Sequence, residues 1–396
     1  MNPIRRAMAA IIWLCTPLLA DGDEIPSVPA PRPPPATLAQ VDAGMRRGVD
    51  YLLHSQNKDG SWGGPTRTKD LNIYAPLPGA HLAFRTGTSA LALCGMIDSR
   101  DSRPEADTAI TRATTWLETE GSKLRRADQT TTYNVWGHAY ALHAACRIYL
   151  RSDAVGKERV TAFARQQLDL LRRYEDINGG WGYLDFEFFT QRPSGLPTSF
   201  TTATALLAMR QTRDVIGLPL DDKTITTSLA FLRRQRTPDS CYVYADPHRY
   251  HPARPINLPQ GSVGRNQACN AALRAFSDPL ITDAVLDTWT TRFFELEKWL
   301  DVARKRPVPH ESFSKVAGYF YYYGVYYFTE SARYLPKARQ AQLAPRLAAI
   351  LLSHQEKDGS WWDYPLYNYH QAYGTGFALM TLAWCRDVME GDSSAR

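Results

Sequence analysis

Apolar residues recur along most of the chain at the spacing of helix faces. Before the first loop, Val41, Met45, Val49, Leu52 and Leu53 follow the three- and four-residue period of one buried stripe. Similar stretches alternate with loops, and together they predict six pairs of helices. The pairs cover residues 38–56 with 85–97, 104–121 with 132–150, 156–174 with 198–212, 222–236 with 264–276, 281–304 with 314–331, and 337–356 with 370–389.

The second helix of several pairs carries a frame of small residues, as at Thr86-Gly87, Thr202-Ala203 and Thr375-Gly376. Small side chains let helix backbones approach closely, which suits a crowded inner layer. The aromatic run over residues 319–328 could pass for a strand, but its place in the repeat predicts an inner helix.

The loop after the first helix reappears near the end of the chain. Residues 52–62 read LLHSQNKDGSW, and residues 351–361 read LLSHQEKDGSW. A weaker copy ends at Trp181, and another keeps Gln235 but places Cys241 where the tryptophan is expected. Repeated helical hairpins form either an open solenoid or a closed ring. Six pairs with closely similar first and last copies predict closure, so the fold expected for residues 38–390 is an all-α (α/α)6 toroid.

The two ends of the chain differ from this repeat. Arg5 and Arg6 precede a short apolar stretch ending at Ala20, which is typical of a signal peptide over residues 1–20 and predicts export to the periplasm or beyond. That stretch is too short for a stable membrane span, so the mature chain is expected to have none. Residues 21–37 are proline-rich and predict a disordered linker, and residues 391–396 predict a disordered tail.

Composition narrows the functional classes. The 396 residues are 44% hydrophobic with a formal net charge of +6, and the basic residues are interspersed with acids. Without a basic stripe interleaved with aromatics, nucleic-acid binding is not expected. The five cysteines after residue 20 are scattered and odd in number, which does not describe a disulfide framework.

The pattern Gln56-x-x-x-Gly60-x-Trp62, repeated from Gln355 to Trp361, resembles the QW motif of the prenyltransferase and squalene-cyclase repeat family. The resemblance covers nearly the whole chain after residue 38, as a single-toroid member, and implies a central cavity open where the inner helices begin. A glutamine can hydrogen-bond loop backbone while a tryptophan packs on the next repeat. We therefore expect structural staples at Gln56, Trp62, Trp181, Gln355 and Trp361.

The catalytic signatures of that family are missing or displaced. The chain has no Asp-x-Asp-Asp motif, and its one Asp-Asp pair precedes an outer helix. The family's zinc ligands are an Asp-x-Cys pair and a distant histidine, which invites comparison with Asp239, Cys241 and His370. Here the pair comes before a long loop rather than next to an inner helix, so no cofactor is expected, with zinc at these three residues as the alternative.

Residues near the starts of inner helices should face the cavity. His370, His138 and His81 are the candidates for proton transfer, because histidine titrates near neutral pH, and Asp185 and Asp363 are loop carboxylates nearby. The expected cavity rim consists of Arg85, Thr86, Asn134, Trp136, Thr202, Arg265, Asn266, Tyr319, Tyr323, Tyr369 and Tyr373. These residues could equally cap helices and fill a narrow ring.

The sequence thus predicts a ring that binds an apolar or isoprenoid-like small molecule and leaves catalysis open. An alternative is a glycan-active lyase or hydrolase, with sugars stacked on residues such as Trp136, Trp181 and Trp361 and uronates paired with Arg85 or Arg265. A further alternative is a non-catalytic protein-binding ring. A deep apolar funnel would favour the lipid ligand, an open polar groove the glycan, and a plugged ring the scaffold.

Overall fold

The computed structural model describes residues 32–69, 78–124, 134–182 and 196–391. The expected signal peptide, most of the linker and nearly all of the tail lie outside these ranges, as does Asp185. Within them the chain has twelve α-helices and no β-strand apart from two isolated bridges. None of the described helices is both long and apolar enough to span a bilayer.

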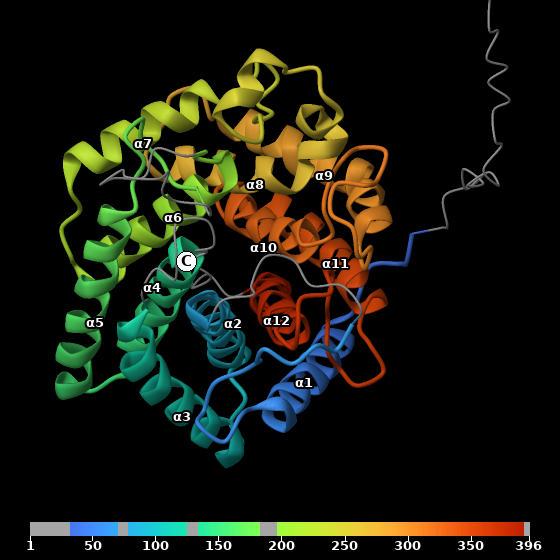
Figure 1. The fold of residues 1–396 in the computed structure, drawn as a ribbon. Coiled ribbons are helices and arrows are strands. Elements are labelled where there is room, and N and C mark those ends of the chain that lie inside the picture. The colour runs from blue at the N-terminus through green and yellow to red at the C-terminus, as the bar shows by residue number, and fades with distance from the viewer. Residues whose placement is uncertain (1–31, 70–77, 125–133, 183–195, 392–396) are drawn as a thin grey trace, which may run out of the picture. The chain divides into compact units, whose positions relative to one another are not determined.

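The compact unit that begins at Pro34 consists of two concentric layers of helices (Figure 1). Each inner helix packs against the next, and α12 closes the ring by packing against both α2 and α1. The predicted (α/α)6 toroid is therefore confirmed. The outer helices are α1 (Leu38–Ser55), α3 (Pro104–Glu120), α5 (Ala154–Arg173), α7 (Asp222–Arg234), α9 (Asp283–Ala303) and α11 (Lys337–Ser353). The inner helices are α2 (Pro78–Ser99), α4 (Asn134–Arg151), α6 (Ser199–Ile216), α8 (Pro259–Ala275), α10 (Phe320–Ala332) and α12 (His370–Met389).

Side-chain caps fix where several helices begin. Thr37 and Gln40 form a reciprocal capping box at the start of α1, and Thr198, Asp221 and Thr282 accept backbone N–H groups at the starts of α6, α7 and α9. Asp221, from the one Asp-Asp pair, is therefore a cap on the outer layer.

Glycine pairs set the spacing of the inner helices. A Cβ on Gly324 of α10 would lie 2.7 Å from the Cα of Gly264 on α8. At the seam where the ring closes, a Cβ on Gly95 of α2 would lie 3.0 Å from the Cα of Gly376 on α12. No other residue type fits such crossings without moving a helix, so the small-residue frame produces the tight inner layer.

The repeated loops share one hydrogen-bonding geometry. The indole Nε1–H groups of Trp62, Trp181 and Trp361 each donate, over 2.8 Å, to the carbonyl oxygen ten residues earlier in the preceding outer helix. The Gln355 side chain donates to the carbonyl oxygens of Gly359 in its own loop and Gly44 on α1, each over 2.9 Å. The Gln355 bond to Gly44 joins the last repeat to the first.

The fourth loop is in a different register from the one expected. Tyr242, not Cys241, takes the place of the tryptophan and is fully buried. Its backbone N–H donates to Asn266 on α8 over 2.9 Å, as the backbone N–H of Trp62 donates to Ser89 on α2 over 2.9 Å. The sequence comparison aligned Gln235 with the glutamine of the motif, which placed Cys241 at the tryptophan position. That alignment was wrong by one residue.

The helix expected from residue 314 begins only at Phe320. Lys305, His310 and Lys315 have φ angles of +66°, +62° and +57°, which a right-handed helix cannot contain. Residues 304–319 consequently form an irregular loop between α9 and α10.

Candidate ligand-binding cavity

A cavity of about 310 Å³ lies among the first turns of the inner helices. Its described walls come from α2, α4, α6, α10 and α12 and from the loops that precede α10 and α12. This volume is at the lower end of the range of roughly 300–1,000 Å³ typical of small-molecule pockets. The described lining residues are Ala83, Phe84, Gly87, Thr88, Leu91, Trp136, Tyr140, Phe200, Pro309, His310, Tyr319, Tyr323, Tyr364, Leu366, Tyr373 and Phe377.

Aromatic rings make up more than half of this lining. The Phe200 ring lies 4.9 Å from Phe320 and 6.0 Å from Trp136, measured between ring centroids. Tyr323 uses its hydroxyl internally, because it donates to the carbonyl oxygen of Phe200 over 3.0 Å. The wall around Phe200 is thus apolar, and the Tyr323 hydroxyl beside it is already engaged.

A histidine and a tyrosine form one polar pair in the cavity. His310 Nδ1 lies 2.7 Å from the carbonyl oxygen of Lys315, so this nitrogen carries the proton. In the neutral ring Nε2 is then an acceptor, and the Tyr319 hydroxyl lies 3.2 Å from it. Burial lowers the pKa of His310, which favours the neutral ring.

A carboxyl group and a second tyrosine form another polar pair. Tyr373 lines the cavity, and its hydroxyl makes a short hydrogen bond to Oδ1 of the fully buried Asp363. The other carboxyl oxygen, Oδ2, accepts the backbone N–H of Tyr322 over 3.0 Å. Burial raises the pKa of Asp363 to about 7, although these hydrogen bonds and the charge of Arg304 act in the opposite direction.

Four residues of the expected rim line the cavity, namely Trp136, Tyr319, Tyr323 and Tyr373. Several others hold the surrounding framework. Thr202 Oγ1 accepts the backbone N–H of Trp181 over 2.9 Å, and Asn134 Nδ2 lies 3.2 Å from the Tyr174 hydroxyl. The remaining framework residues are Asn266, which binds the Tyr242 backbone, and Thr86, whose hydroxyl is buried.

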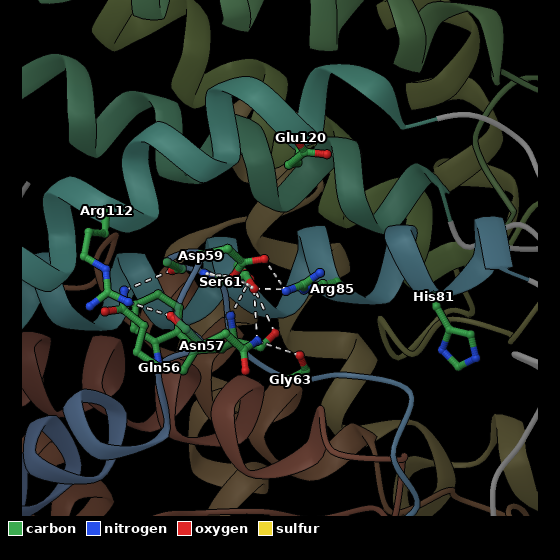
Figure 2. Close-up of polar contacts among 12 residues, drawn as sticks. Gln56, Asn57, Asp59, Ser61, Gly63, His81, Arg85, Arg112 and Glu120 are labelled. Carbon is green, nitrogen blue, oxygen red and sulfur yellow. Dashed lines mark hydrogen bonds and ion pairs between the residues drawn. The ribbon is translucent and has the colours of Figure 1, made fainter.

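Neither expected rim arginine points into the cavity. Arg85 turns back to the first repeat loop, where its Nε donates to Ser61 over 2.8 Å and its Nη2 pairs with Asp59 over 2.5 Å (Figure 2). Arg265 is 1% exposed and donates to the carbonyl oxygens of Tyr242, Gly261 and Ile256. Both guanidinium groups are thus occupied by structural partners.

The three histidines chosen for proton transfer are absent from the described lining of the cavity. His138 faces the outer layer, with Nδ1 2.7 Å from Gln167 on α5. His81 lies near the start of α2, apart from the Arg85 contacts (Figure 2), and its Nδ1 is 3.1 Å from the Tyr369 hydroxyl. His370 Nδ1 is 2.8 Å from the carbonyl oxygen of Tyr367, and burial lowers the pKa of His370 to about 4.

The three residues considered for zinc are not brought together as a ligand group. Cys241 Sγ lies 3.5 Å from Asp239 Oδ2, but His370 does not join them. Among the described residues, the one such group with all ligand atoms within 4.8 Å of one another is Glu297, Asp301 and His354. In that group Tyr321 already donates to Glu297 and Arg304 to Asp301.

Sequence reasoning missed His310 and the aromatic residues Phe84, Phe200 and Phe377. His310 lies in the loop before α10, whereas His81 and His370 lie in the first turns of α2 and α12. The sequence analysis sought candidates only near the starts of the expected inner helices, and the helix expected from residue 314 did not include His310. Phe200 and Phe377 lie next to the small-residue frame, and nothing in a single sequence separates cavity-facing aromatics from core aromatics.

No family model and no curated protein sequence matches the chain. Solved structures do match it. Cellobiose 2-epimerase from Spirochaeta thermophila has a TM-score of 0.57 and 15% identity over 89% of this chain and 98% of its own. Type II terpene cyclase MstE from Scytonema has a TM-score of 0.52 and 14% identity over 89% and 99%. The GH76A α-1,6-mannanase from Salegentibacter sp. has a TM-score of 0.52 and 11% identity over 87% and 98%.

These identities show the fold alone. The chain has the α/α toroid fold, an architecture that it shares with a terpene cyclase, an epimerase and a mannanase. What this particular ring binds has to be argued from its own cavity.

Proposed function

We propose that this protein binds an apolar, isoprenoid-like small molecule in the central cavity. The observation that carries the proposal is the cavity lining, which combines aromatic rings with Ala83, Leu91 and Leu366 and contains no described lysine, arginine or carboxylate. Such walls bind a ligand through burial of apolar surface, at roughly 25 cal/mol per Å². The solved type II terpene cyclase of the same fold supports a ligand of this class.

The glycan alternative has less support from the same residues. Trp181 and Trp361 are 0% exposed, and their indole N–H groups are bonded inside the repeat loops, so they are not sugar platforms. Arg265 is buried under backbone carbonyls and cannot meet a uronate. The described lining also lacks the carboxylate pair that most glycoside hydrolases use.

The proposal includes export, because residues 1–20 read as a signal peptide. An exported protein with an apolar cavity would shield its ligand from water. Neither zinc nor another cofactor is part of the proposal.

Native mass spectrometry of protein purified from its own host tests the proposal. We expect a co-purifying apolar molecule in the wild-type protein and its loss in Gly87→Phe. A Cβ at Gly87 meets nothing closer than 3.8 Å, so the larger side chain can enter the cavity without displacing a helix. Leu150→Phe, on an exposed position of α4, is the matched control and should retain the ligand. A protein that carries only sugars, or a Gly87→Phe variant that keeps the ligand, would contradict the proposal.

A further inference from the structure

The cavity combines apolar walls with two hydrogen-bonded pairs of opposite chemical character. Tyr319 and His310 offer a basic nitrogen behind a hydroxyl, and Tyr373 and Asp363 offer a hydroxyl backed by a buried carboxyl group. The Tyr319 and Tyr364 rings are in edge contact with centroids 5.5 Å apart, and Tyr364 follows Asp363 in the chain. Both pairs therefore lie along one wall.

The hydrogen bonds of Asp363 determine where its proton resides when the carboxyl group is neutral. Oδ2 accepts a backbone N–H and cannot carry a proton at the same time in that direction, so the proton belongs on Oδ1, which faces the Tyr373 oxygen. Asp363 then donates to Tyr373, and the Tyr373 O–H is released to donate to another acceptor. The pKa of about 7 means that this form is well populated near neutral pH.

A tyrosine hydroxyl backed by a neutral carboxyl group in an apolar site is a strong donor for an oxygen that gains negative charge. In the second pair, His310 is held with its Nε2 lone pair directed at the Tyr319 hydroxyl. Its backbone sits at a φ of +62°, a conformation that costs free energy for a residue other than glycine. The loop thus maintains the histidine at this place against a local conformational cost.

We propose that the cavity is catalytic and promotes proton transfer next to a carbonyl group of its apolar ligand, with Tyr373 binding the carbonyl oxygen and the Tyr319–His310 pair taking the proton from the neighbouring carbon. This inference rests on the proposed function, since it needs an apolar ligand in the same cavity.

The step balances without a co-reactant. The C–H bond next to the carbonyl breaks, and its proton passes to the Tyr319 oxygen as the Tyr319 proton moves to His310 Nε2. The C–H electron pair forms a carbon–carbon double bond, and the carbonyl π electrons move to the oxygen, which Tyr373 stabilises. Return of the proton to the same or a neighbouring carbon completes an exchange or an isomerisation.

Exchange of 2-decalone, a saturated bicyclic ketone, in deuterated buffer at pH 7 tests this step by mass spectrometry. We expect the wild-type protein to incorporate deuterium next to the carbonyl well above the buffer rate. His310→Gln should lower the protein-dependent rate by about 100-fold or more, the usual size of a general-base effect. Tyr373→Phe should lower it by about 100-fold, as for loss of one oxyanion donor. Both variants should still bind 2-decalone, measured separately by calorimetry.

His251→Gln and Tyr334→Phe make the same chemical changes outside the cavity and should leave the exchange rate unchanged. If the wild-type protein binds 2-decalone but exchanges it only at the buffer rate, or if His310→Gln retains the wild-type rate, the inference is wrong and the binding function stands. If 2-decalone does not bind at all, the proposed binding function fails, and the inference fails with it.

Discussion

At the residue scale, the repeat loops depend on glycines at which no other side chain fits. Gly359 has a φ of +89°, and a Cβ there would lie 2.4 Å from the carbonyl oxygen of Arg47 on α1. The equivalent Gly60 would meet Arg112 of α3 at 2.5 Å. The glycine of the motif therefore serves both the turn and the contact with the neighbouring outer helix.

We predict that Gly359→Ala lowers the free energy of unfolding by more than the cost of backbone strain, because the new Cβ also clashes with Arg47. Gly217 is the matched control, because its φ is +79° and a Cβ there would meet nothing within 4 Å. We expect Gly217→Ala to cost about 1 kcal/mol and Gly359→Ala to cost clearly more, measured by urea unfolding. Equal costs would show that the contact with Arg47 does not matter.

Asp363 makes stability depend on pH in a defined direction. Its folded-state pKa of about 7 exceeds the ordinary value of 3.8, so the folded protein binds a proton that the unfolded chain releases. Its contribution is therefore complete below about pH 4 and is lost as pH rises through about 7. Asp363→Asn keeps the shape without the titration. We expect its stability relative to wild type to increase between pH 4 and pH 8, by about 2–4 kcal/mol. A difference that is flat with pH would contradict the raised pKa.

At the element scale, Arg265 of α8 clamps the long loop between α7 and α8. Its guanidinium group donates to three backbone carbonyls, and burial lowers the pKa of Arg265 to about 10. From the sequence alone, Arg265 was expected at the rim of the cavity. The fold instead buries it, because residues 242–261 close over the start of α8.

We predict that Arg265→Met destabilises the protein by about 3–5 kcal/mol, since three buried carbonyl oxygens lose their donor. Arg265→Lys should not restore stability, because an ammonium group on a single stem cannot match the fork of a guanidinium group. Limited proteolysis should cut both variants within residues 246–258 faster than the wild-type protein. Full stability of the lysine variant would contradict the clamp.

The helices and their order were accessible from the sequence, whereas the positions of polar side chains were not. Helical periodicity and the small-residue frame depend on local spacing, which the sequence records directly. By contrast, Arg85 pairs with Asp59 in the loop before its own helix, and His138 contacts Gln167 on α5, and both orientations depend on tertiary packing that the sequence does not record. His310 was missed because it lies in the segment between the two expected helices, and the positive φ angles that bring this loop to the cavity leave no mark in the sequence.

At the scale of the whole molecule, closure removes the free ends that an open solenoid would have. The Gln355 side chain donates a hydrogen bond to the carbonyl oxygen of Gly44 on α1. The Arg100 guanidinium group pairs with Asp387 over 2.9 Å across the seam between α2 and α12. A closed ring should therefore unfold cooperatively, without fraying of the first and last repeats.

Hydrogen–deuterium exchange followed by mass spectrometry tests this expectation. We predict that amides in α2 and α12 are protected to about the same degree as those in α6 and α8. Exchange of α2 and α12 that is orders of magnitude faster than that of α6 and α8 would indicate that the seam opens independently.

A titration with two ligands of different chemistry shows which class the cavity binds. Farnesol, an isoprenoid alcohol, and cellobiose should be titrated into the wild-type protein and into Gly87→Phe while tryptophan fluorescence is followed. We expect saturable binding of farnesol to the wild-type protein alone and no binding of cellobiose to either protein. Binding of cellobiose, or equal binding of farnesol to the filled cavity, would contradict it.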